Sequence, residues 1–171
     1  MSAAEIVYIN PTLADLPDGR CKTAFRFWLS AHGAGDLPAP EAIDVLIIPK
    51  SIVANASIYD VEDVGDGEKR FRFRFLGTAI LGAIGFDPTG TYFDDVAGTG
   101  PLVGRLLECV NTRRPYFYQG PLFWRNIQIP VYRSLGLPFA KLDAPVTMVM
   151  AFAESYRSPT PRAEAAGEGE S

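Results

Sequence analysis

The sequence predicts an α+β fold, in which a helix, two strands, further helices and then three strands follow one another. Arginine and phenylalanine alternate strictly over 70–75, and this period of two is typical of a half-buried strand. Gly65-Asp66-Gly67, just before it, indicates a hairpin turn. An amphipathic helix near 101–114 precedes strand-like segments at 116–124, 127–139 and 146–154.

Length and charge bound the class of protein. The 171 residues suit one domain, and a hydrophobic share of 47% suits a packed core. The net charge of −4 argues against a nucleic-acid partner or an anionic membrane, because either needs a cationic surface. The start lacks the pattern of a secretory signal, and the apolar run 79–86 is shorter than the roughly 20 residues of a membrane span. We therefore expect a cytoplasmic protein.

Composition divides the chain into three segments. Residues 157–171 hold no large apolar side chain, so we expect a disordered tail. Residues 1–18 carry a few apolar side chains interrupted by Pro11 and Pro17, which predicts an arm lying on the body. The folded domain then covers 19–156, and it begins with an amphipathic helix near 19–32 that Asp18 caps.

The first two strands are predicted at 56–64 and 68–76. If Val64 faces Glu68, charged residues pair on one face of this hairpin and apolar residues on the other. The expected pairs are Glu62 with Arg70, Asp60 with Arg72, Val61 with Phe71, and Tyr59 with Phe73. A short helix at 78–86, weakened by Gly82 and Gly85, follows the hairpin.

Few residues favour catalysis. His32 is the single histidine and ends the first predicted helix, where capping or packing explains it. Cys21 and Cys109 form no C-x-x-C pair, so we expect two small buried residues. Asp94 and Asp95 are adjacent and are expected to point in different directions, which weakens an acid–base pair. A small-molecule enzyme that uses these two carboxylates stays an alternative.

The arginine–phenylalanine alternation also allows an RNA-binding module, since RNA-recognition strands mix basic and aromatic residues. A stacking platform needs both kinds of side chain exposed side by side. Here Arg70 and Arg72 fall on the face opposite the aromatic residues. RNA binding is therefore the weaker of the two alternatives.

One segment resembles a known family. Residues 73–78 (FRFLGT) and 85–90 (GFDPTG) are similar to the signature aromatic-Arg-x-x-Gly-Thr … Gly-x-Asp-x-Thr-Gly of small stand-alone bacterial PAS-domain proteins. Weaker likeness extends over about 20–155. Pro88 departs from the pattern, because an apolar residue is common there, and so does Ala144-Pro145, which replaces a polar turn. The resemblance implies a PAS fold, with a five-stranded antiparallel sheet, helices packed on one face and an N-terminal amphipathic helix.

The resemblance also implies a function. It implies a sensory or signalling domain that binds a small ligand or a partner protein and relays its state through protein–protein contacts, without catalysis. PAS domains that bind haem or flavin are known, but this chain has no matching cysteine motif and no histidine within the predicted sheet, so the cofactor stays open. A homodimer through the N-terminal helix is expected to use Phe25, Trp28 and Leu29.

Candidate ligand-binding residues combine the signature with the aromatic-rich interior. They are Phe73, Arg74, Phe75, Thr78, Phe86, Tyr116, Tyr118, Met148 and Met150. Within the signature, Arg74, Thr78, Asp87 and Thr89 are expected to fix the turn beside the pocket, or else only to brace the fold.

Overall fold

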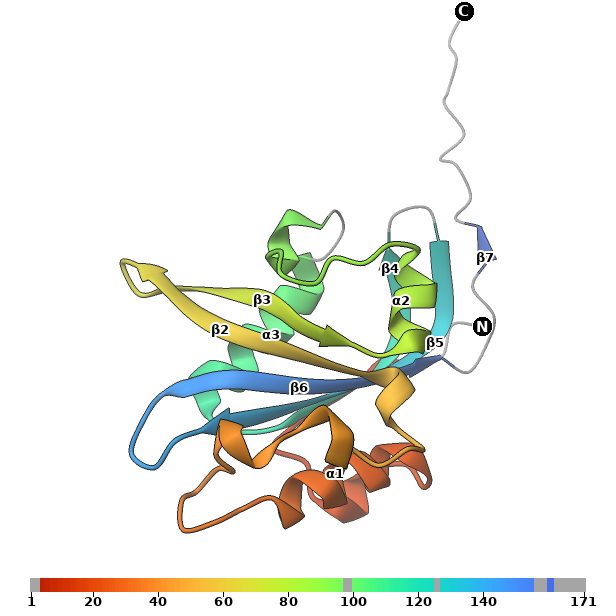
Figure 1. Ribbon diagram of the computed structural model, residues 1–171. Coiled ribbons are helices and arrows are strands. Elements are labelled where there is room, and N and C mark those ends of the chain that lie inside the picture. The colour runs from red at the N-terminus through yellow and green to blue at the C-terminus, as the bar shows by residue number, and fades with distance from the viewer. Residues whose placement is uncertain (1–3, 97–99, 125–126, 156–159, 162–171) are drawn as a thin grey trace, which may run out of the picture.

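The computed structural model describes residues 4–96, 100–124, 127–155 and 160–161 (Figure 1). Its strands form one antiparallel sheet in the order β1-β4-β5-β6-β2-β3, and β7 pairs with β5. The strands are β1 (Ile6–Ile9), β2 (Ala56–Gly65), β3 (Glu68–Leu76), β4 (Tyr116–Trp124), β5 (Ile127–Ala140), β6 (Val146–Ser155) and β7 (Thr160–Pro161).

The predicted count of five strands is wrong, because β1 extends the sheet along β4 and β7 adds a short pair beside β5. The segment 1–18, predicted as an arm, thus supplies a strand. Ile6–Ile9 escaped prediction because a run of four residues carries no clear alternation. The predicted tail, 157–171, lies outside the described residues except for Thr160–Pro161.

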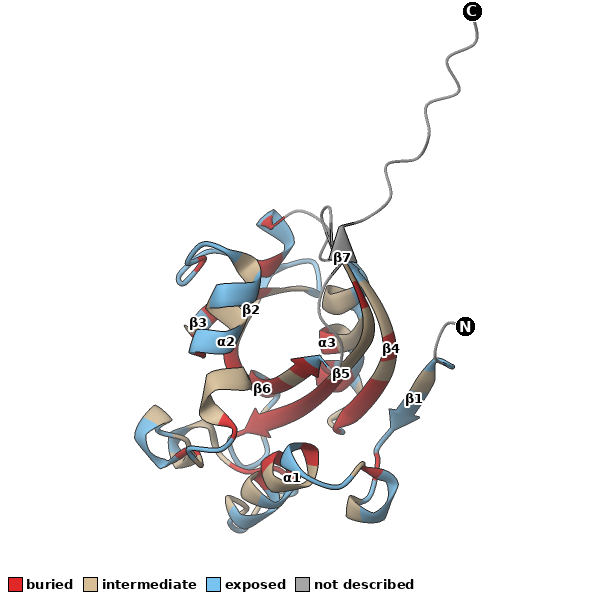
Figure 2. Ribbon diagram, turned by 90° about the vertical axis from the view of Figure 1, so that its right-hand side faces the viewer, coloured by how far each residue is buried: buried red, intermediate tan, exposed pale blue. Residues whose placement is uncertain are grey.

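The helices are α1 (Arg20–Ser30), α2 (Thr78–Ile84) and α3 (Gly100–Thr112). Figures 1 and 2 show α1 on one side of β6, and α2 and α3 on the other. The two helices that follow the hairpin, α2 and α3, thus share one face of the sheet, and the N-terminal amphipathic helix α1 packs on the other. Among the described residues, no helix has the length and apolar character needed to cross a bilayer.

Short 3₁₀ turns connect these elements. Four of them precede β2, namely η1 (Leu13–Asp15), η2 (Pro40–Ala42), η3 (Val45–Ile47) and η4 (Val53–Asn55), and the fifth, η5 (Phe93–Asp95), lies between α2 and α3. Asp44 caps the turn η3, because its side chain accepts a hydrogen bond from the Leu46 N–H at 2.9 Å.

The first helix begins and ends close to its expected bounds. Gly19, rather than Asp18, is the N-cap residue, and Asp18 instead forms an ion pair with Lys22 at 2.7 Å. Trp28 lies on the buried side of α1 and donates from Nε1 to the Pro138 oxygen at 2.8 Å. His32 Nδ1 lies 3.0 Å from the Trp28 oxygen and its ring contacts the Trp28 ring edge-on, which confirms the capping and packing role.

The hairpin register confirms all four pairs expected around its centre. The Val64–Glu68 pair is wrong, because a bulge sets Gly65 opposite Glu68. The turn is therefore two residues long, and Asp66 and Gly67 both adopt positive φ, 52° and 75°. This pair of left-handed residues matches the twist of the flanking strands.

Glycines of the signature set the path of the chain after β3. A Cβ at Gly77 would lie 2.3 Å from the Ala54 oxygen, so only glycine permits this contact with η4. Gly85 ends α2 with φ 85°. Gly90 has φ 86°, and its N–H donates to the Phe73 oxygen at 2.8 Å, which returns the chain to the outer edge of β3.

Replacing Gly77 with alanine tests the close contact between the start of α2 and η4. We expect Gly77→Ala to lower the free energy of unfolding by about 1–3 kcal/mol, because the backbone must shift to accept the methyl group. The control is Gly82→Ala, where a Cβ meets no atom within 4 Å. This control should raise stability by about 0.5–1 kcal/mol through helix propensity. Urea unfolding of both variants measures the difference, and equal effects would contradict the account.

Candidate functional site

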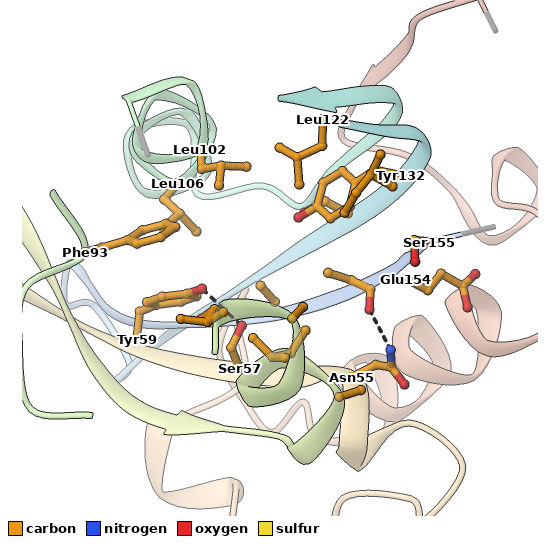
Figure 3. A pocket seen from close by; sticks show the side chains of 18 of the residues that line it. Asn55, Ser57, Tyr59, Phe93, Leu102, Leu106, Leu122, Tyr132, Glu154 and Ser155 are labelled. Carbon is orange, nitrogen blue, oxygen red and sulfur yellow. Dashed lines mark hydrogen bonds between the residues drawn. The ribbon is translucent and has the colours of Figure 1, made fainter. Parts of the chain in front are cut away.

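A cavity of about 210 Å³ lies between the sheet and the layer formed by α2, η5 and α3 (Figure 3). Its walls are mostly apolar, and the chain segments that supply them are far apart in sequence. The apolar lining residues are Tyr59, Phe73, Ala79, Ile80, Ala83, Ile84, Phe93, Val96, Leu102, Leu106, Tyr116, Leu122, Ile129, Tyr132, Ala151 and Ala153. The floor is the face of the sheet that carries small side chains.

The alternation of small and large side chains along β6 explains why a cavity forms on this face of the sheet. Successive residues of a strand point to opposite faces, and Ala151 and Ala153 line the cavity. Met150 and Phe152, which alternate with them, are fully buried, and Arg20 of α1 lies over the Phe152 ring. Large side chains therefore fill the face toward α1, while methyl groups leave room under α2 and α3.

Hydroxyl groups gather on the same floor. Ser57 Oγ donates to the Tyr59 hydroxyl at 3.2 Å, and Tyr116 and Ser134 share a hydrogen bond of 3.3 Å. The Tyr132 hydroxyl interacts with the same Ser134. Burial raises the pKa of all three tyrosines, so each hydroxyl keeps its proton at neutral pH.

Glycine at position 136 gives Tyr116 its orientation. Gly136 pairs with Tyr116 across β4 and β5, and a Cβ there would lie 2.1 Å from the Tyr116 ring. The ring thus lies across the glycine, and its hydroxyl reaches Ser134, two residues earlier on β5. Any other residue at 136 would displace the Tyr116 ring and break the hydrogen bond between its hydroxyl and Ser134.

Glu154 is the one charged residue among the described residues that line the cavity, and its carboxylate points away from the space (Figure 3). The side chain is 5% exposed and forms ion pairs with Arg20 at 2.9 Å and with Arg133 at 3.7 Å. Cys21 Sγ donates to the same carboxylate at 3.7 Å. Burial, followed by the charge of Glu154, raises the pKa of Cys21 to about 12. Cys21 and Cys109 are both buried and free, as expected.

An aromatic group closes one end of the cavity. Phe93 stacks on Tyr59 with centroids 5.2 Å apart and meets Phe73 edge-on at 5.0 Å. Phe93 belongs to η5, so its position depends on how residues 86–96 dock against β3. Tyr92 provides the anchor, because its hydroxyl donates to Glu62 at 2.5 Å and accepts from Arg72 at 2.7 Å.

Arginines complete this anchor. The guanidinium of Arg70 lies 3.7 Å from the centre of the Tyr92 ring, and that of Arg72 lies 4.2 Å from it. Arg72 also binds Glu62 at 2.7 Å and donates to the Gly90 oxygen. We call Glu62, Arg70, Arg72 and Tyr92 the Tyr92 cluster.

Of the nine predicted ligand residues, Phe73 and Tyr116 line the cavity. Tyr118 is buried on the same face, but its hydroxyl donates to the Pro121 oxygen at 2.8 Å. Met148 and Met150 lie on the opposite face, next to α1. The other four, Arg74, Phe75, Thr78 and Phe86, are also absent from the cavity lining.

The polar signature residues act locally. Arg74 pairs with Asp60 at 3.2 Å, and Thr78 is exposed at the start of α2. Asp87 accepts from the Thr89 amide at 3.0 Å and from its hydroxyl at 2.6 Å, which makes a closed turn. These contacts brace the chain and do not reach the cavity.

The two candidate carboxylates of the enzyme alternative converge, contrary to expectation. Asp94 and Asp95 each lie 2.9 Å from Nη2 of Arg70. An arginine held between two exposed carboxylates is an ion-pair arrangement, and neither carboxylate belongs to the described lining of the cavity.

Sequence reasoning missed the hydroxyl floor. Ser57, Tyr132 and Ser134 are not part of the signature, and each alone is an ordinary strand residue. The available signal was the alternation Tyr132, Ser134, Gly136 on one face of β5, opposite Arg133, Leu135 and Leu137 on the other.

No protein-family model, no curated protein and no solved structure matches this chain. The functional conclusion therefore rests on the cavity and on the resemblance of the signature segment.

The Tyr92 cluster predicts a dependence of stability on pH. Hydrogen bonds from Arg72 and then Tyr92 lower the pKa of Glu62 from 4.5 to about 2. The contribution of this carboxylate to stability is complete above pH 4.5 and disappears as the pH falls toward 2. Glu62→Gln should therefore lose less stability between pH 6 and pH 3 than the unmodified protein.

Urea unfolding at the two pH values measures this difference. Glu108→Gln, on the exposed side of α3, removes the same charge without touching the cluster and should behave like the unmodified protein. An identical pH dependence for Glu62→Gln and the unmodified protein would argue against the cluster.

Proposed function

We propose that this protein is a sensory domain of the PAS type, which binds a small molecule in the cavity and relays its state through protein–protein contacts. The observation that carries the proposal is the cavity itself, apolar on its walls and lined on its floor by neutral hydroxyls. Sites for small molecules combine mostly apolar walls with a few polar groups that orient the ligand.

The fold supports the same class. A hairpin, β2 and β3, precedes the helical segment that spans α2 to α3, and β4, β5 and β6 complete the sheet. The cavity lies where that helical segment crosses the sheet. At this crossing, Gly77 makes a backbone contact that leaves no room for a Cβ, and Gly85 and Gly90 adopt positive φ.

A route from the cavity to α1 supports the relay. Asn55 lines the cavity, accepts a hydrogen bond from Arg20 at 2.9 Å and donates to the Ala153 oxygen at 3.0 Å. Arg20 is the first residue of α1 and also binds Glu154. A ligand that displaces Asn55 would therefore change the contacts that hold the start of α1.

The outer face of α1 is the surface we propose for a partner or a second copy. Leu29 is 45% exposed, whereas Phe25 and Trp28 are buried against the rest of the chain. A homodimer through this helix would accordingly use Leu29 and its exposed neighbours. We place the function in the cytoplasm, and the two free thiols agree with a reducing compartment.

Filling the cavity tests the proposal. Ala151→Leu adds bulk to the floor, so we expect it to abolish retention of a small molecule while leaving the protein folded. Met150→Leu is the matched control, because it changes the next residue on the opposite face at nearly constant volume. Native mass spectrometry of the three purified proteins measures the retained mass.

The expected result is a bound species on the unmodified protein and on Met150→Leu, and none on Ala151→Leu. Retention by Ala151→Leu equal to that of the unmodified protein would place the ligand elsewhere. Bare protein masses in all three samples would contradict ligand binding.

A further inference from the structure

We propose that the cavity binds the apolar body of a small carboxylate, and that Arg105 of α3 holds the carboxylate group. This inference rests on the proposed function, because it names the ligand class of the same cavity. Three observations lead to it: a buried N–H group of Arg105 without a partner, the position of this side chain at one end of the cavity, and the size of the space.

Arg105 has an unsatisfied donor. Its Nη1 is the one buried side-chain nitrogen or oxygen atom that has no hydrogen-bond partner among the described residues. Nor does any acid in that part of the chain form an ion pair with this arginine. A guanidinium stays charged throughout the physiological pH range and carries five N–H donors. Leaving one of them buried and unpaired costs free energy, which an anionic acceptor would recover.

The guanidinium lies near the Tyr132 end of the cavity. Its carbon is 3.6 Å from the centre of the Tyr118 ring, and the centroids of the Tyr118 and Tyr132 rings are 6.3 Å apart. Tyr132 lines the cavity at the end opposite Phe93 (Figure 3). Burial raises the pKa of both tyrosines, and the positive charge of Arg105 acts against this rise at each hydroxyl. A positive charge therefore stands one ring away from the lining.

Neighbouring residues fix this charge beside the apolar walls. The Tyr118 hydroxyl donates to the Pro121 oxygen at 2.8 Å, which holds the ring that Arg105 covers. A contact between a guanidinium and a ring face uses none of the N–H groups as hydrogen-bond donors. Residues three apart are neighbours on a helix, so Arg105 lies beside Leu102, which lines the cavity. A ligand whose apolar body packs on Leu102 can thus place its polar end at Arg105.

Two nearby carboxylates leave the charge of Arg105 available. Glu154 lines the cavity, but Arg20 and Arg133 bind it at 2.9 Å and 3.7 Å. Glu5 is exposed just before β1, and its charge acts on the Tyr118 hydroxyl. Within the described residues no ion pair joins Glu5 to Arg105. An anion that enters the cavity would therefore supply the missing partner.

Size and charge together favour a monocarboxylate. A dry apolar cavity of about 150 Å³ is enough for benzene, whereas drug-sized ligands occupy roughly 300–1,000 Å³. The present cavity, about 210 Å³, suits a substituted benzene or an aliphatic chain of similar size. One guanidinium matches one negative charge, and its parallel N–H groups match the two oxygens of a carboxylate. A phosphate ester carries nearly two charges and three acceptor oxygens, which a single arginine does not satisfy.

Two probes of the same shape, 4-methylbenzoate and 4-methylbenzamide, test the ligand class because they differ in charge. Isothermal titration calorimetry at pH 7, where the carboxyl group is ionised, measures their affinities for protein refolded to remove bound molecules. We expect the unmodified protein to bind the benzoate at least tenfold more tightly than the benzamide. Arg105→Gln should reduce this ratio about tenfold. Arg105→Lys should reduce it less, because lysine keeps the charge but not the paired N–H groups.

Two variants at exposed positions serve as controls. Arg114→Gln removes the same charge from an exposed arginine that follows α3, and it should leave the ratio unchanged. Glu5→Gln removes a repelling carboxylate, so it should tighten binding of the benzoate about two- to fivefold and leave binding of the benzamide unchanged. Equal ratios in the unmodified protein and in Arg105→Gln, or tighter binding of the benzamide to the unmodified protein, would overturn the proposed class.

Binding of the benzamide also reports whether the cavity of Arg105→Gln is intact. If this variant binds neither probe, Glu5→Gln decides: tighter binding of the benzoate supports the proposal, and unchanged binding rejects it.

The outcomes separate this inference from the proposed function. If neither probe binds but the purified protein retains a small molecule that Ala151→Leu loses, the ligand class is wrong and the sensory function stands. If neither probe binds and no molecule is retained, both proposals fail.

Discussion

Large and small side chains alternate along β6, and the remainder of the molecule is arranged around this alternation. Met148, Met150 and Phe152 close the face toward α1, where Trp28 and Arg20 pack against the sheet. Ala151 and Ala153 leave the opposite face open, so the helices above it enclose a space instead of a filled core. Since β6 lies between β5 and β2, neither face can change without disturbing both neighbours.

The roof of the cavity depends on interactions at the edge of the sheet. Residues 90–92 run along β3, where Phe73 N–H donates to the Thr91 oxygen at 3.0 Å, and the Tyr92 cluster fixes this segment. That docking covers the edge of β3 and sets Phe93 over Tyr59. A polar cluster at the surface therefore determines the shape of an apolar cavity, which explains why charged residues of the hairpin matter to a site that none of them lines.

Much of the fold follows from local sequence pattern, but the floor of the site does not. The strict alternation over 70–75 predicted β3 and the central register correctly, because a one-residue slip would bury arginines. The bulge at Gly65 was not predicted, since it depends on the geometry of the turn and not on the alternation of apolar and charged residues. Phe73 and Tyr116 were recognised as candidates from their aromatic character. Met148 and Met150 were included among the candidates although they lie on the face toward α1, because residue type alone does not tell which face of a central strand borders a cavity.

Xenon binding tests whether β6 leaves a cavity on one face and a filled core on the other. Crystals of protein refolded to remove bound molecules would be pressurised with xenon, which enters dry apolar cavities. We expect an anomalous peak above Ala151 and Ala153, between the sheet and Leu106. A peak on the α1 side of β6, or none over Ala151 and Ala153, would contradict it.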